Sequence, residues 1–522
     1  MATSSIAARL GFGPRARKTA EQKALDEVAS KQAVDKKQLA FDLFTQLSYM
    51  ASLATAKASR DVMFMRAASL NLASSPYFVQ INTLVHRLKY DYSEACRSIA
   101  DRVSEPDVAA LLLRMSGSLS SGEDEAEFLN REAAVMAELY EAQYEADIES
   151  LRKWSDAYAA LIVSAGLVVV VSIISMMIYT LGAGMILLTG MLTVGVTSVG
   201  TWVLHISAPK ESFTRKAGLS SDLQLKALAW FRVTAPIGFI GGAVAWAAGG
   251  GLGWFMMIAG ASLIPPGFLM WRDMGRLRKL DADIATSTRM LGGITSAIGT
   301  TIRDALTKVD RRSLGSLEPY YRKLQVRMSA GIAPERCWKR FVTESGSELI
   351  ERTVNIFWDA LTIGGEPGET GRNAAFFSSK ISILRQKREL VAATFGYLVL
   401  PLHAAMTGLL VFIVKVMSLF AESLVQQAPD PNATGAPIPD LAGVGGFNTF
   451  ASVNFDFLNL LVAAVIVVFT LANALAPWGA SGGHRLRMVL NLGMMMVISG
   501  VMLTVIPPIA DAIFEVITAP AA

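Results

Sequence analysis

The chain has 522 residues, of which 52% are hydrophobic and 18% are charged, and its mean hydropathy is +0.40. A charged fraction well below the roughly 25% of an average soluble protein argues against a purely soluble enzyme and against disorder. The two cysteines, Cys96 and Cys337, exclude a disulfide scaffold and a cysteine-rich zinc site. The four histidines lie far apart in the sequence, so we expect no metal centre and no cofactor.

Long apolar stretches without Asp, Glu, Lys or Arg indicate membrane helices, because about 30 Å of hydrocarbon requires about 20 helical residues. Residues 157–206 and 233–271 are each long enough for two spans. The second of these pairs contains Gly249-Gly250-Gly251 as its turn. Residues 390–414, 457–481 and 488–510 each suit one span. The sequence therefore predicts seven transmembrane helices.

The 48 Lys and Arg residues predict the orientation. Residues 1–156 carry 19 of them, 207–232 carry 5 and 272–389 carry 21, with two more in the connection at 482–487. The last is Lys415, at a span end where its ammonium group can reach the interface. The loop 416–456 and the tail 511–522 contain no Lys or Arg. Seven crossings from a cytoplasmic N-terminus then place every basic segment inside, and the C-terminus outside the cell membrane.

The first 37 residues form a basic, Ser- and Ala-rich arm without the apolar core of a cleavable signal peptide. A transit peptide has a similar composition, but in a polytopic chain we favour a cytoplasmic arm that lies on anionic lipid or on a partner protein. In the outer loop, Asn432-Ala433-Thr434 has the pattern of a glycosylation acceptor.

The two large segments expected on the cytoplasmic side, 38–156 and 272–389, predict helical bundles. Apolar residues recur in them at helical spacing, strand signals are scarce, and each has enough residues for a core of its own. A shift of 243 residues superposes Arg60-Asp61 on Arg303-Asp304, Pro76-Tyr77 on Pro319-Tyr320, and Gly122-Glu123 on Gly365-Glu366. The chain is thus predicted to be a tandem duplication of a bundle followed by membrane helices.

The arrangement resembles the type II secretion F-domain family, the platform proteins of type IV filament machines. The resemblance rests on the segment from Leu112 to Asp124, on Gly364-Gly365-Glu366-Pro367, and on two such domains in one polytopic chain. It is most similar to the archaeal platforms of archaella and pili, and to the bacterial tight-adherence pair fused. The expected parts are an arm (1–37), F-domain 1 (38–156), spans 1–2 (157–206), a cytoplasmic loop (207–232), spans 3–4 (233–271), F-domain 2 (272–389), span 5 (390–415), an outer loop (416–456), spans 6 (457–481) and 7 (488–510), and an outer tail (511–522).

The resemblance implies a non-enzymatic role in the cytoplasmic membrane beneath a growing filament. Its implied partners are a cytosolic hexameric assembly ATPase, pilin- or archaellin-like subunits, membrane lipid and a second copy of the chain, with no nucleic acid. The sequence agrees, since it has no Gly-x-x-x-x-Gly-Lys-Ser/Thr phosphate loop, no His-Glu-x-x-His and no Gly-x-Ser-x-Gly motif.

The duplicated charged motifs have two interpretations each. Glu123 and Glu366 precede long helices and suit helix N-termini, although an interdomain or metal contact is the alternative. The Arg-Asp pairs at 60–61 and 303–304 are either surface ion pairs or joints between helices. We take all eight motif residues as structural or partner contacts: Arg60, Asp61, Gly122, Glu123, Arg303, Asp304, Gly365 and Glu366.

The second bundle has 21 Lys and Arg against 14 acidic residues, whereas residues 1–156 have 19 against 22. The interior basic residues of the second bundle are therefore candidates for docking an acidic face of the ATPase. They are Arg311, Arg312, Arg322, Lys323, Lys339 and Arg340.

Two other functions remain open from the sequence. A transporter or channel requires polar residues along the spans, and no run of intramembrane acids is present. His403, beside Pro401, is expected to be a hydrogen-bonded structural residue. A receptor that senses through the outer loop is the third reading, and the Pro- and Gly-rich composition of that loop argues against a folded sensor.

Overall fold

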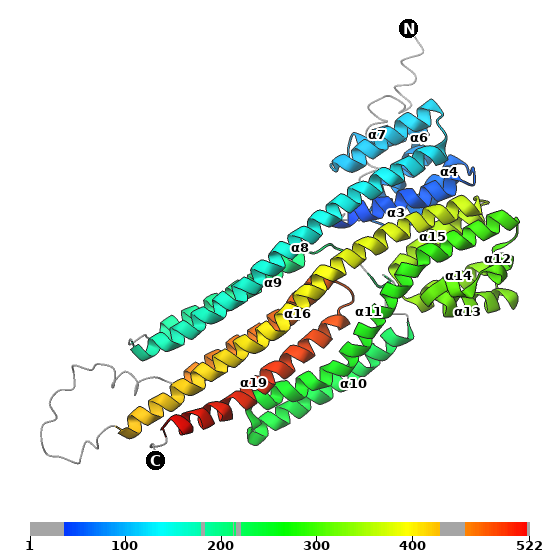
Figure 1. The fold of residues 1–522 in the computed structure, drawn as a ribbon. Helices are drawn as coiled ribbons and strands as arrows, with labels where there is room; N and C mark the ends of the chain where they lie inside the picture. The colour runs from blue at the N-terminus through cyan, green and yellow to red at the C-terminus, as the bar shows by residue number, and fades with distance from the viewer. Residues whose placement is uncertain (1–35, 179–182, 212, 216–220, 428–454, 519–522) are drawn as a thin grey trace, which may run out of the picture. The chain divides into compact units, whose positions relative to one another are not determined.

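The computed structural model describes residues 36–178, 183–211, 213–215, 221–427 and 455–518. These residues form helices joined by short connections (Figure 1). Within them no β-strand forms, and the sole extended pairing is a single bridge between Thr214 and Ser347. The predicted all-α fold is confirmed. The arm 1–35 and the acceptor Asn432 lie outside the described residues.

Of the residues described, the first of two compact units takes in those up to Glu145, the short segment 213–215, and Arg276–Arg385. Its helices come from both predicted bundles. The first set is α3 (Lys36–Ala54), α4 (Arg60–Ser69), α5 (Ser75–Leu88), α6 (Tyr92–Ala100), α7 (Pro106–Ser121) and the start of α8 (Glu125–Ile178). The second set is the end of α11 (Gly251–Ile298), α12 (Ile302–Lys308), the turn η2 (Arg311–Leu317), α13 (Glu318–Ser329), α14 (Pro334–Ser345), α15 (Glu348–Thr362) and the start of α16 (Pro367–Gln427).

The helix order of the first set recurs in the second. Ser59 caps α4 and Thr301 caps α12, since each hydroxyl accepts a backbone N–H of the first turn. Proline is the second residue of both α5 and α13, where its missing N–H costs nothing. Each long helix, α8 or α16, then follows a glycine with positive φ, Gly122 (75°) or Gly364 (93°). The structure thus pairs Gly122 with Gly364, one residue from the sequence match to Gly365.

An aromatic cluster joins the two sets of helices. Phe41 and Phe44 of α3 lie against Tyr140 of α8 and Phe377 of α16. The ring centroids of Phe44 and Phe377 are 5.1 Å apart, and those of Phe41 and Tyr140 are 5.5 Å apart. Phe41, Phe44 and Phe377 are almost fully buried. The two copies therefore share a core within one compact unit.

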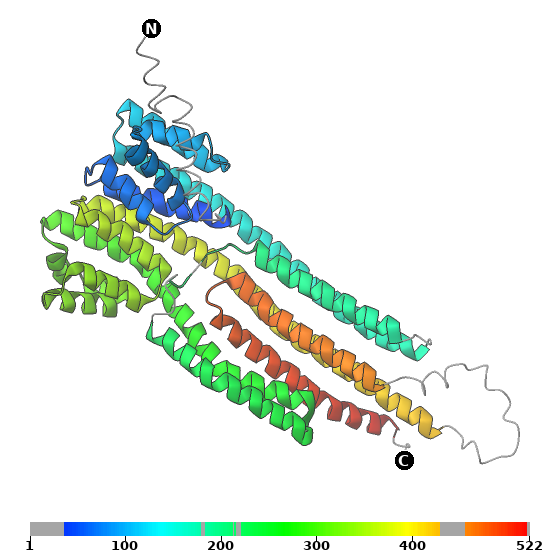
Figure 2. The same cartoon turned by 180° about the vertical axis from the view of Figure 1, so that it is seen from behind.

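The second unit holds the apolar helices. It contains the remainder of α8, α11 and α16, together with α9 (Ala183–Ser207), α10 (Asp222–Ala245), α18 (Phe455–Ser481) and α19 (Leu486–Thr518). Among the described residues, six helical segments are long and apolar enough to cross a membrane. One of these, Asp222–Ile298, reverses direction between α10 and α11, so all seven predicted spans are helical. Helix α18 packs against α9 and α19, and Figure 2 shows it alongside α19.

The reversal between α10 and α11 depends on glycine. Gly249 has φ of 95° and Gly251 has φ of 69°, a region that side chains with a Cβ rarely adopt. The two helices then pack antiparallel and very close to each other. A Cβ on Gly238 would collide with the side chain of Ser262, and a Cβ on Gly242 would lie 2.9 Å from the carbonyl oxygen of Phe255. Gly238 and Gly242, one helical turn apart, thus form a small-residue face in close helix contact.

Candidate interaction surface and the joint between the two copies

The six candidate docking residues lie in η2, α13 and α14, and all six are exposed. Lys323 and Arg340 each lie 3.8 Å from the carboxylate of Glu344. In the described part of the chain, the side chains of Arg311, Arg312, Arg322 and Lys339 form no ion pair. The geometry therefore leaves these four cations accessible to a partner.

The Arg-Asp motif of the first copy ties α4 to three other helices. Arg60 donates to Glu125 of α8 at 2.5 Å. Asp61 accepts the Tyr92 hydroxyl of α6 at 2.9 Å and lies 3.0 Å from Nε2 of His86 in α5. Burial and the Asp61 carboxylate raise the pKa of Tyr92, so its hydroxyl stays a donor.

The same motif plays a different part in the second copy. The Asp304 carboxylate accepts the Thr301 hydroxyl at 2.9 Å at the start of α12, and Arg303 reaches the carbonyl of Ser329 at 3.4 Å. The equivalent residues therefore share a helix N-terminus and differ in their partners. The roles of these residues beyond this local structure remain a prediction.

The two Gly-Glu motifs both stabilise the start of a long helix. Glu123 accepts Arg131 at 2.6 Å, which lowers the pKa of the Glu123 carboxyl. Glu366 accepts the Ser296 hydroxyl at 2.5 Å and the backbone N–H groups of Glu369 and Gly368, contacts that lower its pKa. Gly365 lacks room for a side chain, since a Cβ would lie 2.8 Å from the carbonyl oxygen of Ala360 and 3.0 Å from the hydroxyl of Thr55 in the first copy.

A cluster of buried charges lies at the joint between the copies, and sequence reasoning missed it. Arg352 of α15 donates to Asp42 of α3 at 2.7 Å and to Glu348 at 2.7 and 3.1 Å. Its guanidinium also lies 4.1 Å from the ring centre of Phe41. Although burial opposes the positive charge, Asp42 and Glu348 raise the pKa of Arg352. No local pattern marks these residues, because they are 310 positions apart.

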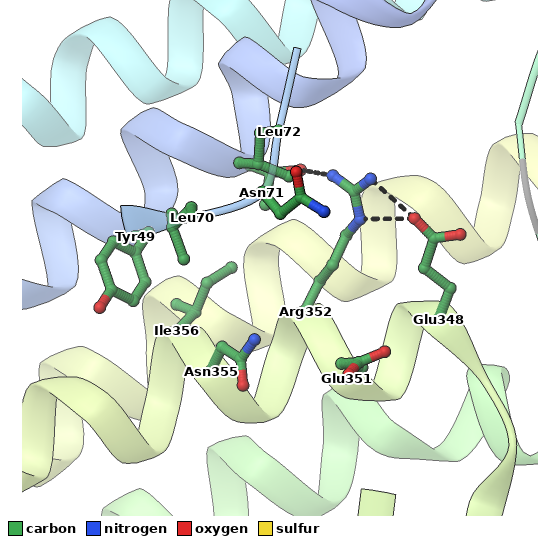
Figure 3. Close-up of a pocket in the computed structure, with 10 residues that line it drawn as sticks. Tyr49, Leu70, Asn71, Leu72, Glu348, Glu351, Arg352, Asn355 and Ile356 are labelled. Atoms are coloured by element: carbon green, nitrogen blue, oxygen red, sulfur yellow. Dashed lines mark hydrogen bonds and ion pairs between the residues drawn. The ribbon is translucent and has the colours of Figure 1, made fainter. Parts of the chain in front are cut away.

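A cavity of about 350 Å³ adjoins this joint (Figure 3). Its walls come from α3, from the connection between α4 and α5, and from α15. Figure 3 shows Asn71 close to the Arg352 guanidinium, with Glu348 on its other side. Glu351, which lines the cavity, also accepts two hydrogen bonds from Arg215, at 2.8 and 2.9 Å.

Arg215 belongs to a strap formed by Phe213, Thr214 and Arg215 in the connection between α9 and α10. The carbonyl of Phe213 accepts the N–H of Glu348 at 3.2 Å, and the guanidinium of Arg385 lies 4.6 Å from the Phe213 ring centre. Arg385 in turn donates to the buried Asp281 at 2.6 Å. The strap thus holds the start of α15.

The second unit contains a chain of buried hydrogen bonds that the sequence did not predict. The Tyr158 hydroxyl donates to Asn473 at 3.0 Å, and the Asn473 amide lies 3.0 Å from Nδ1 of His403. Nε2 of His403 lies 2.8 Å from Ser499, whose hydroxyl lies 2.8 Å from that of Thr470. If Asn473 donates to Nδ1, then His403 donates through Nε2 and is neutral. The chain ties together α8, α16, α18 and α19.

Comparison with known proteins finds two relatives, both named flagella accessory protein J. The protein of Methanocaldococcus jannaschii is 21% identical over 412 residues, covering 76% of this chain and 71% of the relative. That of Methanococcus voltae is 20% identical over 454 residues, covering 84% and 78%. No family model matches the chain, and no solved structure matches it.

Both likenesses extend over more than three quarters of the chain, so each takes in parts of both copies and of the membrane helices. The residues described contain no group of three or more His, Cys, Asp or Glu side chains arranged to hold a metal ion. The first unit offers two candidate features, an exposed basic surface on η2, α13 and α14 and a buried ionic joint between α3 and α15.

Proposed function

We propose that this chain is the membrane platform of an archaellum-type filament machine and is not itself an enzyme. The observation that carries the proposal is the likeness to two flagella accessory proteins over more than three quarters of the chain. The repeated helix order, each copy of which runs into a long apolar helix, supports it. We also propose that residues 38–156 and 272–389 are its two F-domains, as expected from the sequence.

A cytosolic hexameric ATPase is the proposed partner of the basic surface. Four of its six cations have no acidic partner within the described residues, so an acidic face can approach without first breaking an ion pair. We further propose that the ATPase drives pilin- or archaellin-like subunits from the membrane into the filament. Two copies of the chain form the working platform.

The proposed location is the cytoplasmic membrane, with the N-terminus inside and the C-terminus outside. The sorting of Lys and Arg supports this orientation. A transporter is the second candidate, because the Tyr158–Asn473–His403 chain is polar and buried within the apolar unit. Substrate flux in vesicles reconstituted with the full-length chain separates the two: a platform gives no flux above that of empty vesicles.

Removal of the gene tests the platform proposal directly. A platform predicts loss of surface filaments with subunits retained in the membrane, and restoration when the gene is returned on a plasmid. Filaments are counted by electron microscopy and membrane subunits by immunoblot. Normal filament numbers in the deletion strain would overturn the proposal.

The docking surface is tested with the full-length chain in nanodiscs and the purified assembly ATPase of the same cell. The variant is Arg322→Glu with Lys339→Glu, since both side chains are exposed and neither forms an ion pair within the described residues. The matched control is Lys57→Glu with Arg97→Glu, an equal charge change at exposed positions of the first copy. We expect the first variant to weaken binding at least tenfold and the control to change it less than twofold. An equal loss in both would rule out this surface.

A further inference from the structure

A cavity of about 370 Å³ lies between α8 and α16 inside the second unit. One wall is polar and comes from α8, with Arg152, Ser155 and Asp156. The other is mostly apolar and comes from α16, with Leu390, Val391 and Leu398. Its volume is on the scale of a small-molecule site. The cavity is amphipathic, with charge on one helix and hydrocarbon on the other.

The charged wall is available to a ligand. Arg152 and Asp156 are one helical turn apart, so both side chains project from the same face of α8. Both are exposed, and neither has an ionic or hydrogen-bonding partner anywhere in the described ranges. In contrast, the hydroxyl of Ser155 is satisfied by the carbonyl of Leu151 at 2.8 Å. The cavity therefore offers one cation and one anion side by side.

The cavity lies where a membrane surface is expected. The charge-free stretch of α8 begins at Ala157, directly after Asp156. Trp154 of α8 is 43% exposed and Tyr397 of α16 is 78% exposed, and such rings gather at the boundary between headgroups and hydrocarbon. A ligand in the cavity would therefore have its head among the lipid headgroups and its tail in hydrocarbon.

We propose that this cavity binds a single phospholipid of the leaflet next to the bundles. The Arg152 guanidinium takes the phosphate, because its planar donors match phosphate oxygens. Asp156 accepts the ammonium or hydroxyl donors of the headgroup, and an acyl or isoprenoid tail lies along Leu390 and Leu398. Charge complementarity selects a phospholipid over a membrane helix, whose apolar surface would leave both charges unpartnered. The proposal depends on α8 and α16 crossing a membrane and not on the filament function.

The bound lipid would link corresponding parts of the two copies. The paired turn glycines, Gly122 and Gly364, are 242 residues apart. At that spacing Arg152 corresponds to Thr394 and Asp156 to Leu398, and all four residues line the cavity. Both helices follow the matched glycine turns. A lipid seated here therefore fills the space between the two duplicated membrane helices.

The test uses full-length chain purified in detergent and stripped of lipid, with bound lipid counted by native mass spectrometry. The probes are palmitoyl-oleoyl phosphatidylglycerol, phosphatidylethanolamine with the same tails, the headless diacylglycerol, and inorganic phosphate. We expect one tight site for the phospholipids, none for diacylglycerol, and no competition from inorganic phosphate. Diacylglycerol binding as tightly as phospholipid, or displacement by phosphate alone, would overturn the proposal.

The variants locate the site. Arg152→Gln should weaken phospholipid binding about tenfold, the loss expected for one charge-assisted contact. Its control is Lys153→Gln, an equal charge change at a neighbouring exposed residue that does not line the cavity. Thr394→Trp, which fills the cavity from α16, should abolish the site, while Tyr397→Trp on the same helix should leave it intact. Equal losses for Arg152→Gln and Lys153→Gln, or full binding by Thr394→Trp, would contradict the assignment.

Discussion

Arg352 and Asp42, 310 positions apart in the sequence, are joined by a hydrogen bond of 2.7 Å in the interior of the first unit. The bond connects α15 of the second copy with α3 of the first. Asp42 is fully buried, and Arg352 is 6% exposed. The duplicated halves are therefore held by an ion pair shielded from water, next to the aromatic cluster of Phe41, Phe44 and Phe377.

Replacement of Arg352 by Met should destabilise the first unit strongly. It leaves the buried carboxylates of Asp42 and Glu348 without their cation, a loss of about 3–5 kcal/mol. The thermal denaturation midpoint of the full-length chain in detergent measures the effect. The control is Arg372→Met, whose ion pair with Glu369 is exposed and is worth about 0–1 kcal/mol. A fall no larger than that of the control would show that the joint carries little of the stability.

Addition of a second change separates charge from packing at the same joint. Asp42→Leu combined with Arg352→Met removes the Asp42–Arg352 pair and leaves only the Glu348 carboxylate without its cation. The double variant should therefore recover part of the lost stability, because a buried pair replaced by apolar residues is often neutral. The quantity measured is the difference in midpoint between the double and the single variants. A double variant less stable than Arg352→Met alone would contradict this account.

The Glu366 cap should make stability depend on pH in the acid range. A carboxyl whose pKa is lowered by folding stabilises the protein above its unfolded value of 4.5, and the gain disappears as the pH falls through the folded value. Glu366→Gln should therefore be less stable than the parent by about 1 kcal/mol near pH 6, and the difference should shrink toward pH 3. Thermal midpoints at a series of pH values measure it. A difference that is constant across this range would mean that the carboxylate charge is irrelevant.

The contact of α11 with α19 should not tolerate a methyl group at Gly260. A Cβ there would lie 2.8 Å from the carbonyl oxygen of Gly493 and 2.8 Å from Cβ of Met496. Gly260→Ala should therefore force the helices apart at a cost of about 1–3 kcal/mol. The matched control is Gly275→Ala on the same helix, where a Cβ would meet no atom within 4 Å. Equal thermal midpoints for the two variants would refute the close packing.

The buried hydrogen-bond chain should stabilise the membrane helices moderately. Asn473→Leu removes its contacts with Tyr158 and His403, each worth about 0.6–1.7 kcal/mol between membrane helices. The control is Asn459→Leu on the same helix, at an exposed position. Thermal midpoints and resistance to protease in detergent measure both variants. If Asn459→Leu were as unstable as Asn473→Leu, the buried hydrogen bonds of Asn473 would not be what stabilises these helices.

Much of the fold could be predicted from local sequence. The long apolar helices and the turn at Gly249 agree with the hydrophobic pattern and its glycine run. Such features depend on a residue and its near neighbours, through hydrophobic length or positive φ. The second glycine turn was predicted one residue late, because two adjacent glycines are alike in sequence and only Gly364 has the positive φ beside the end of α15.

The candidate residues were only partly foreseeable. The exposed basic residues of α13 and α14 could be identified from charge counts, since exposure leaves charge visible in composition. Asp42 and Arg352 could not, because each resembles an ordinary helix-surface charge until the other copy buries it. His403 was expected to form hydrogen bonds, but its partners Asn473 and Ser499 come from other helices.

The sequence by itself determined which segments are helical and apolar, where they turn, and that a helical unit occurs twice. Those properties follow from hydrophobic length and from backbone geometry, which act over a few residues. Only the tertiary structure decided that the two copies share one core, that Arg352 is their ionic joint, and that Arg152 and Asp156 face an apolar wall of α16. These are pairings between distant residues, and they exist only once packing brings the helices together.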